Sequence, residues 1–205
     1  MKIKLWDFER IYKTINSVIL NEKVDPTGAC TFFSFFGAFI LREHYKIDAQ
    51  PVAGLCMYHM GGDNNVLTFG KRAKDKIVAD TDAFHCWVEG EGWLFDFMAP
   101  AFSDFFLNLG YRIEPKMIQK PLASMANSSL NLIAEGDFYL EPDSEVMKDR
   151  MRYLSSSPAY DDLAEICKQW YTKPPKKMQK SIQIGNGKGK LSSVVLTGKS
   201  VIGTW

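Results

Sequence analysis

Residues 28–44 read GACTFFSFFGAFILREH, and this stretch decides the fold. From Cys30 onward it is apolar on nearly every side, which predicts a helix buried in the core rather than an amphipathic surface helix. Cys30, Ser34 and Gly37 recur at helical spacing, and these small residues would let another element approach the helix closely. Residues 25–28 (DPTG) have the composition of a turn. The sequence therefore predicts a buried helix that begins at a cysteine.

Segments of a different pattern flank this helix. On the N-terminal side, apolar residues between Leu5 and Ile19 fall on one helical face, which predicts a first helix up to about Leu20. On the C-terminal side the pattern changes to that of strands and turns. We expect a strand, a turn, a returning strand and a second hairpin, at residues 51–58, 61–65, 66–69 and 83–97. A cysteine-bearing buried helix packed on an antiparallel sheet is an α+β fold.

The whole chain is expected to form one domain, residues 1–205, with its core at about 25–100. Its 205 residues, of which 46% are hydrophobic, suit a single globular unit. A short helix is expected after Asp143 and another from Tyr160 to Trp170. The pattern of the lysine-rich end predicts short strands at residues 181–184, 191–196 and 201–205.

The C-terminal 40 residues carry a strong positive charge. From Ile166 to Trp205 there are eight lysines and no Asp, Glu or Arg, so the net charge of +1 leaves −7 for the rest of the chain. Such a tail could contact nucleic acid or a membrane. It could equally be a solvated surface or dock onto the acidic body, and the lack of arginine favours this second interpretation. We therefore expect no nucleic-acid partner.

The cysteines and the N-terminus indicate a cytoplasmic protein. Four cysteines lie far apart without a CxxC pair, which is typical of reduced thiols. Three scattered histidines do not suit a zinc site, and we expect neither a metal nor a cofactor. Charges at Asp7, Glu9 and Arg10 interrupt any hydrophobic leader segment, so no signal peptide is expected. The chain has no apolar run of about 18 residues, so no membrane span is expected.

Cys30 is a candidate nucleophile because of its position. The first turn of a helix offers free amide N–H groups and the positive end of the helix dipole, which stabilise a thiolate. The same N–H groups can bind an oxyanion during acyl transfer. Position alone favours a small core residue, and Cys56, Cys86 and Cys167 are expected to be inert core thiols of that kind.

His85 and Asp96 strengthen the case for Cys30. Asp96 lies in an otherwise apolar strand, where an unpaired carboxylate would be costly. If residues 90–91 form a two-residue turn, His85 lies directly opposite Asp96, and the other face of the hairpin is uniformly apolar. A slip of one residue would move Asp96 to that other face. The register therefore predicts a Cys30–His85–Asp96 triad.

Four segments in this order resemble the transglutaminase-like superfamily. They are GAC (28–30) with the helix after it, HYKIDAQPVAG (44–54), FHCWVE (84–89) and WLFD (93–96). The resemblance covers roughly residues 25–100 and extends to the arylamine N-acetyltransferases, which share this papain-like core. It implies a bacterial branch with a cysteine nucleophile, a histidine and an aspartate. The hairpin is shorter than is usual there, Phe97 replaces a proline, and nothing resembles the calcium sites of animal transglutaminases.

The expected function is thiol acyl chemistry on an amide or ester of a peptide, a protein or a small molecule. Cys30 would attack, His85 would move the proton, and Asp96 would hold the imidazole. Peptide hydrolysis, deamidation, transglutamination and acetyl transfer all remain open. The alternative is a catalytically silent peptide- or protein-binding module on the same scaffold.

The surroundings of the triad can also be anticipated. Asn21 is a candidate second oxyanion donor, although a residue that ends the first helix is the simpler interpretation. The pocket walls are expected from residues 61–65, from residues 71–82 and from the segment after Pro100.

Overall fold

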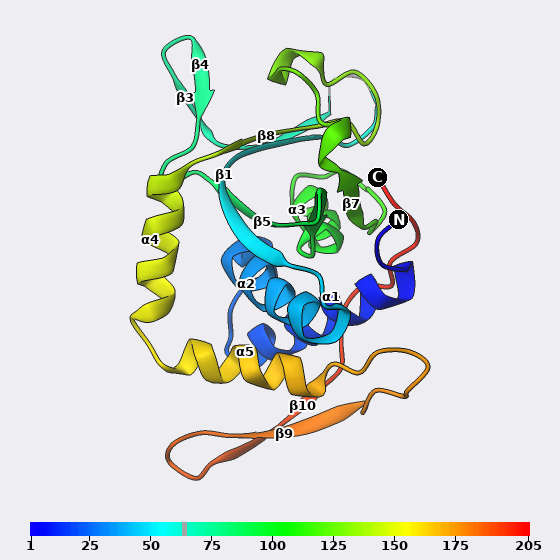
Figure 1. The fold of residues 1–205 in the computed structure, drawn as a ribbon, viewed down its shortest axis with the longest axis vertical. Coiled ribbons are helices and arrows are strands. Elements are labelled where there is room, and N and C mark those ends of the chain that lie inside the picture. The colour runs from blue at the N-terminus through cyan, green and yellow to red at the C-terminus, as the bar shows by residue number, and fades with distance from the viewer. Residues whose placement is uncertain (63–64) are drawn as a thin grey trace.

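The computed structural model describes residues 1–62 and 65–205 and has an α+β fold (Figure 1). Antiparallel strands form one curled sheet with the pairing order β2-β1-β5-β6-β7. Strands β5 and β2 pair with successive parts of one edge of β1, and β8 pairs with its opposite edge. The sheet strands are β1 (Ala49–His59), β2 (Val66–Phe69), β5 (His85–Gly90), β6 (Trp93–Asp96), β7 (Ile118–Pro121) and β8 (Phe138–Pro142). Two separate hairpins pair β3 (Lys71–Ala73) with β4 (Lys76–Val78) and β9 (Ser181–Gly185) with β10 (Leu191–Val195).

The helices pack against this sheet and against one another. They are α1 (Leu5–Asn21), α2 (Cys30–Ile40), α3 (Phe102–Asn108), α4 (Ser144–Ser155) and α5 (Ala159–Trp170). The bounds of α1 and α5 and the start of α4 after Asp143 confirm the sequence predictions. None of the helices in the described part of the chain is long and apolar enough to cross a membrane.

Helix α2 has the buried position that its composition predicts. Beyond Ile40 it continues as a wider turn to Tyr45 and ends where Lys46 adopts a left-handed φ of 57°. A Cβ atom at Gly37 would lie 2.3 Å from the ring of Phe97, so this close approach requires glycine. The predicted role of a small residue is thereby confirmed for Gly37.

The β5–β6 hairpin differs in register from the sequence prediction. Val88 pairs with Phe95 and Gly90 with Trp93, so the turn is formed by residues 91–92 and not 90–91. The reason is that a two-residue hairpin turn of this kind needs positive φ at both positions, and here Glu91 has 49° and Gly92 has 78°. The pairing partner of each β5 residue is thereby displaced by two positions along β6, and this even displacement leaves every side chain on its predicted face.

The C-terminal segment folds back onto the body. The predicted strands at residues 181–184 and 191–196 form the β9–β10 hairpin, whereas residues 201–205 contribute only a bridge from Thr204 to Met117. Asn16 Nδ2 donates to Thr197 O over 3.1 Å, and Lys199 pairs with Asp104 at 2.6 Å. Figure 1 shows the two termini close together. The predicted turn at 61–65 joins β1 to β2, and its residues 63–64 lie outside the described residues.

Candidate active site

Cys30 is the first residue of α2, at a helix N-terminus that lacks a side-chain cap among the described residues. By contrast, Asp143 caps α4 by accepting from the backbone N–H groups of Glu145 and Val146. The residue before Cys30 is Ala29, which cannot accept a hydrogen bond through its side chain. First-turn N–H groups are therefore left to stabilise negative charge beside the thiol.

His85 is the first residue of β5 and is completely buried. It pairs with Gly54 of β1, while Cys56, two residues further along that strand, pairs with Phe69. The rings of His85 and Phe69 consequently stack, with centroids 4.2 Å apart. Phe102, at the start of α3, contacts the imidazole from another side. These aromatic rings hold the imidazole plane in one orientation.

Asp96 is the last residue of β6, and its carboxylate has three donors. His85 Nε2 lies 2.7 Å from Oδ2, the Tyr58 hydroxyl donates to Oδ2 over 3.0 Å, and the Met98 N–H donates to Oδ1 over 3.0 Å. This network satisfies a carboxylate that is only 1% exposed. The observed register places Asp96 across from Trp87, so its contact with His85 is diagonal rather than directly opposite.

The protonation equilibrium of His85 is shifted toward the imidazolium form. Burial disfavours the imidazolium, but the Asp96 carboxylate and the Cys30 sulfur outweigh burial and raise the pKa of His85 to about 10. Because Nε2 faces Asp96, Nδ1 is the nitrogen left for the thiol. Nδ1 is buried and has no conventional hydrogen-bond partner among the described residues.

The Cys30 thiol is shifted in the opposite direction. The neighbouring Cys86 thiol and the charge of His85 hold the pKa of Cys30 well below its usual range in spite of burial. The interaction with Cys30, together with burial, raises the pKa of the Cys86 thiol. The site therefore favours a Cys30 thiolate beside a His85 imidazolium, with Cys86 protonated.

The structure brings Cys30, His85 and Asp96 together but leaves Asn21 elsewhere. Asn21 ends α1, and its amide donates to Glu22 over 2.8 Å. Its side chain lies beside α5 and the β9–β10 hairpin in a separate surface depression. The oxyanion assignment of Asn21 is therefore wrong, because the loop between α1 and α2 carries the chain away from that residue before Cys30 is reached.

Two residues near the triad, Tyr58 and Cys86, were not predicted from the sequence to belong to the site. Tyr58 shares a face of β1 with Cys56 and reaches Asp96, and only the pairing of β1 with β5 could have indicated this. Cys86 was expected to be an inert core thiol, yet its sulfur lies 3.7 Å from the hydroxyl of Thr31, next to Cys30, and it lowers the pKa of Cys30. Its position directly after His85 was the available signal.

The triad is closed from solvent in this conformation. Cys30 is 7% exposed, and Phe102 lies over the His85 ring. Helix α3 packs against the turn at Pro26–Gly28, immediately before Cys30. The segment after Pro100 therefore flanks the site as predicted. Residues 71–78 instead form the β3–β4 hairpin, which projects away from the body (Figure 1).

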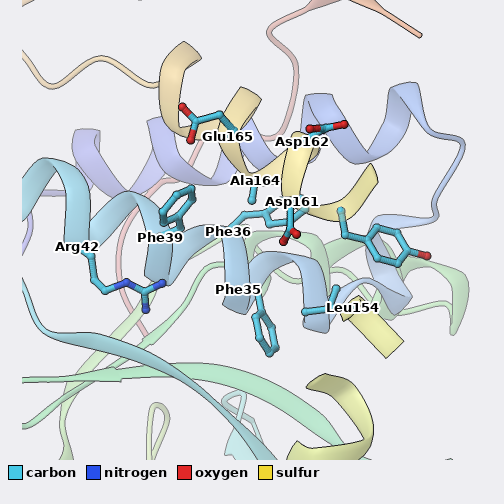
Figure 2. Close-up of a pocket in the computed structure, with 10 residues that line it drawn as sticks. Phe35, Phe36, Phe39, Arg42, Leu154, Asp161, Asp162, Ala164 and Glu165 are labelled. Atoms are coloured by element: carbon cyan, nitrogen blue, oxygen red, sulfur yellow. The ribbon is translucent and has the colours of Figure 1, made fainter. Parts of the chain in front are cut away.

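A crevice lies on the other side of α2, between that helix and α5 (Figure 2). We call it the α2–α5 crevice, and its volume is about 530 Å³. Its apolar wall includes Phe35 and Phe39, and its charged rim includes Arg42 and Asp161. The triad residues do not line it. Among the described residues, no group of His, Cys, Asp and Glu side chains is arranged to hold a metal ion.

Three comparisons place the chain among known proteins. A search of curated proteins finds no match. A solved crystal structure, described as that of a genomics target, shares 40% sequence identity with a TM-score of 0.91, and the match covers 100% of this chain and 98% of the other. A family model described as "Protein of unknown function (DUF2026)" matches residues 4–205. The chain therefore belongs to the DUF2026 family.

Proposed function

We propose that this protein is a thiol enzyme that acts on an amide or ester through an acyl-enzyme on Cys30. The observation that carries the proposal is the buried hydrogen bond of 2.7 Å between His85 Nε2 and Asp96 Oδ2, which leaves Nδ1 for the thiol. The low pKa of Cys30 and the high pKa of His85 support the thiolate–imidazolium pair that such chemistry uses.

The reaction follows from these positions. The Cys30 thiolate attacks the carbonyl carbon, and the resulting oxyanion is stabilised by N–H groups in the first turn of α2. The tetrahedral intermediate collapses, the bond to the amine or alcohol breaks, and His85 Nδ1 gives its proton to this leaving group. Asp96 fixes the imidazole tautomer and stabilises its charge. Water or an acceptor amine then attacks the thioester, and His85 takes up the proton released.

The resemblance to transglutaminase-like enzymes supports the same class of reaction. Peptide hydrolysis, deamidation, transglutamination and acetyl transfer share this triad, and the substrate is a peptide, a protein or a small amide or ester. We also propose that the reaction takes place in the cytoplasm, since the cysteines Cys30, Cys56, Cys86 and Cys167 are all free.

A second candidate function is a binding module that retains the triad without using it. The closure of the site favours this candidate, because a substrate carbonyl must reach a sulfur atom that is 7% exposed. Movement of α3 away from the turn at Pro26–Gly28 would open the path that the enzyme needs. The two candidates therefore differ in whether Cys30 can be acylated.

A small activated ester distinguishes them. Mixing p-nitrophenyl acetate with the full chain should release a burst of p-nitrophenol and leave one acetyl group on Cys30, detected by peptide mass spectrometry. Cys30→Ser should abolish the burst, and Cys167→Ser should preserve it because Cys167 lies on α5. If Cys30 stays unmodified in the folded wild-type protein, the enzyme proposal is wrong and the binding module remains.

A further inference from the structure

Two thiols meet where α2 lies against β5. Cys30 begins α2, and Cys86 is the second residue of β5. The Cys86 thiol lies 3.7 Å from the hydroxyl of Thr31, the residue directly after Cys30, and neither cysteine is in a disulfide. Interaction with Cys86 also lowers the pKa of the Cys30 thiol. Strand β6 ends at Asp96, across from Trp87, so it does not extend alongside Cys86.

The Cys86 side chain is fixed toward α2. Thr31 Oγ1 lies 3.7 Å from Cys86 Sγ, and the Thr31 and Ser34 hydroxyls each act to lower the pKa of this thiol. Ser34 Oγ also donates to the Thr31 carbonyl over 3.0 Å, which ties the two hydroxyl residues together. Cys86 is only 1% exposed, so its sulfur faces the helix and not solvent.

Cys56 and Cys167 are placed less favourably than Cys86 for a reaction with Cys30. Cys167 lies on α5 and is completely buried, and this burial raises its pKa. Cys56 lies on β1 near Tyr58 and Asp96, where burial and the Asp96 charge raise its pKa. Cys86, by contrast, lies beside the start of α2, and its interaction with Cys30 lowers the pKa of the Cys30 thiol.

We propose that Cys30 and Cys86 form a reversible disulfide when a hydroperoxide oxidises Cys30, with Cys86 as the resolving thiol. In the first step the Cys30 thiolate attacks a peroxide oxygen. The S–O bond forms, the O–O bond breaks, and the leaving hydroxide or alkoxide takes a proton from the His85 imidazolium. The products are a sulfenic acid on Cys30 and one molecule of water or alcohol.

The second step uses the neighbouring thiol. The Cys86 sulfur attacks the Cys30 sulfur and gives up its proton. The S–S bond forms, the S–O bond breaks, and the departing hydroxide takes the proton to leave as water. The peroxide is reduced by two electrons and the two thiols are oxidised. A small dithiol reverses the reaction and restores the thiolate.

This inference goes beyond the proposed acyl chemistry, because it requires only a reactive thiolate and a protonated neighbour. The disulfide would block the nucleophile while protecting it from further oxidation. Without a resolving thiol, sulfenic acid proceeds to sulfinic acid, which a dithiol does not reverse. Cytosolic disulfides of this kind are transient and redox-sensing.

Mass spectrometry tests the disulfide directly. The full-length reduced protein is treated with a few equivalents of hydrogen peroxide, blocked with N-ethylmaleimide, and digested. We expect peptides that contain Cys30 and Cys86 to be joined, and dithiothreitol to restore iodoacetamide labelling of Cys30. In Cys86→Ser, Cys30 should instead accumulate as sulfinic acid. The iodoacetamide labelling of Cys30 after dithiothreitol treatment should be at least fivefold lower in this variant than in wild type.

Matched controls separate this pairing from general oxidation. Cys56→Ser and Cys167→Ser should retain the 30–86 cross-link, and circular dichroism should confirm that each variant is folded. The cross-link in the wild-type protein is measured without any substitution, so it tests the proposal even if a variant fails to fold. The proposal is overturned if Cys30 is not oxidised, if it pairs with Cys56 or Cys167, or if it reaches sulfinic acid equally fast with and without Cys86.

Discussion

The two sides of α2 differ in what they offer. The thiol face (Cys30, Ser34 and Gly37) is packed against the sheet and leaves almost no space, yet it carries the reactive groups. The crevice face (Phe35, Phe36 and Phe39) borders a hollow of about 530 Å³, yet its wall is formed by apolar rings. The reactive thiol therefore lies on the side of α2 that has the hydrogen bonds and the shifted pKa values, whereas the α2–α5 crevice lies on the opposite side of the helix.

The largest expected effect comes from removing the charge that supports the thiol face. Asp96→Ala leaves His85 and the Tyr58 hydroxyl without their buried acceptor, and loss of one partner of such a pair costs about 3–5 kcal/mol. Urea unfolding should show this loss relative to wild type. A cost below about 1 kcal/mol would mean that the carboxylate does not stabilise the imidazolium.

A smaller effect is expected where α2 approaches the sheet most closely. Gly37→Ala places a methyl group against the ring of Phe97 and should destabilise the fold by about 1–3 kcal/mol. Gly28→Ala is the matched control, because a Cβ atom there meets nothing within 4 Å in the described part of the chain. Equal stability of the two variants in thermal melts would contradict the close packing of the thiol face.

The pH dependence of stability should follow from the thiolate–imidazolium pair. The folded pKa of His85 is raised from 6.5 to about 10, so its contribution is complete below pH 6.5 and is lost as the pH rises through 10. The folded pKa of Cys30 is lowered from 9.0, so its contribution is complete above pH 9 and is lost as the pH falls. Between pH 6.5 and 9 the two slopes cancel.

Wild-type stability should therefore be nearly flat between pH 6.5 and 9. Cys30→Ala keeps only the His85 slope, so the stability of this variant relative to wild type should decrease steadily across the same range. Urea midpoints at intervals of half a pH unit measure both. Parallel curves for the two proteins would exclude a charged pair at the site.

The smallest effect is expected on the crevice face. Phe39→Leu removes part of a half-buried ring and should cost less than about 1.5 kcal/mol. The rate at which iodoacetamide modifies Cys30 should change less than twofold, because Phe39 points away from the thiol face. A change of tenfold or more in that rate would show that the two sides of α2 are coupled.

The elements and the faces of the hairpin could be predicted from the sequence for physical reasons. Apolar runs specify the buried helix, and alternation in the strands specifies which side of β6 carries Asp96. Because a displacement of two residues preserves the faces, Asp96 lies on the predicted face although the predicted turn was wrong. The choice between residues 90–91 and 91–92 depends on two positive φ values, which the sequence pattern does not encode uniquely.

The rest of the site depends on contacts between distant segments. Tyr58 reaches Asp96 only because β1 pairs with β5, and Cys86 lies beside the first turn of α2 only because β5 packs against that helix. The assignment of Asn21 was wrong because closeness in sequence does not determine the path of the loop before Cys30. Partners that lie dozens of residues apart, as Cys30 and Cys86 do, come together only through sheet register and the packing of α2 against the sheet.

The most direct test of the account is the rate of iodoacetamide alkylation at pH 6, followed at each cysteine by mass spectrometry of the native protein. The account predicts that Cys30 reacts at least a hundredfold faster than Cys167, that the rate stays nearly constant up to pH 8, and that Cys30→Ala removes the fast phase. If Cys30 reacts no faster than Cys167, or only as the pH approaches 9, the thiolate–imidazolium pair does not exist and the proposed chemistry is contradicted.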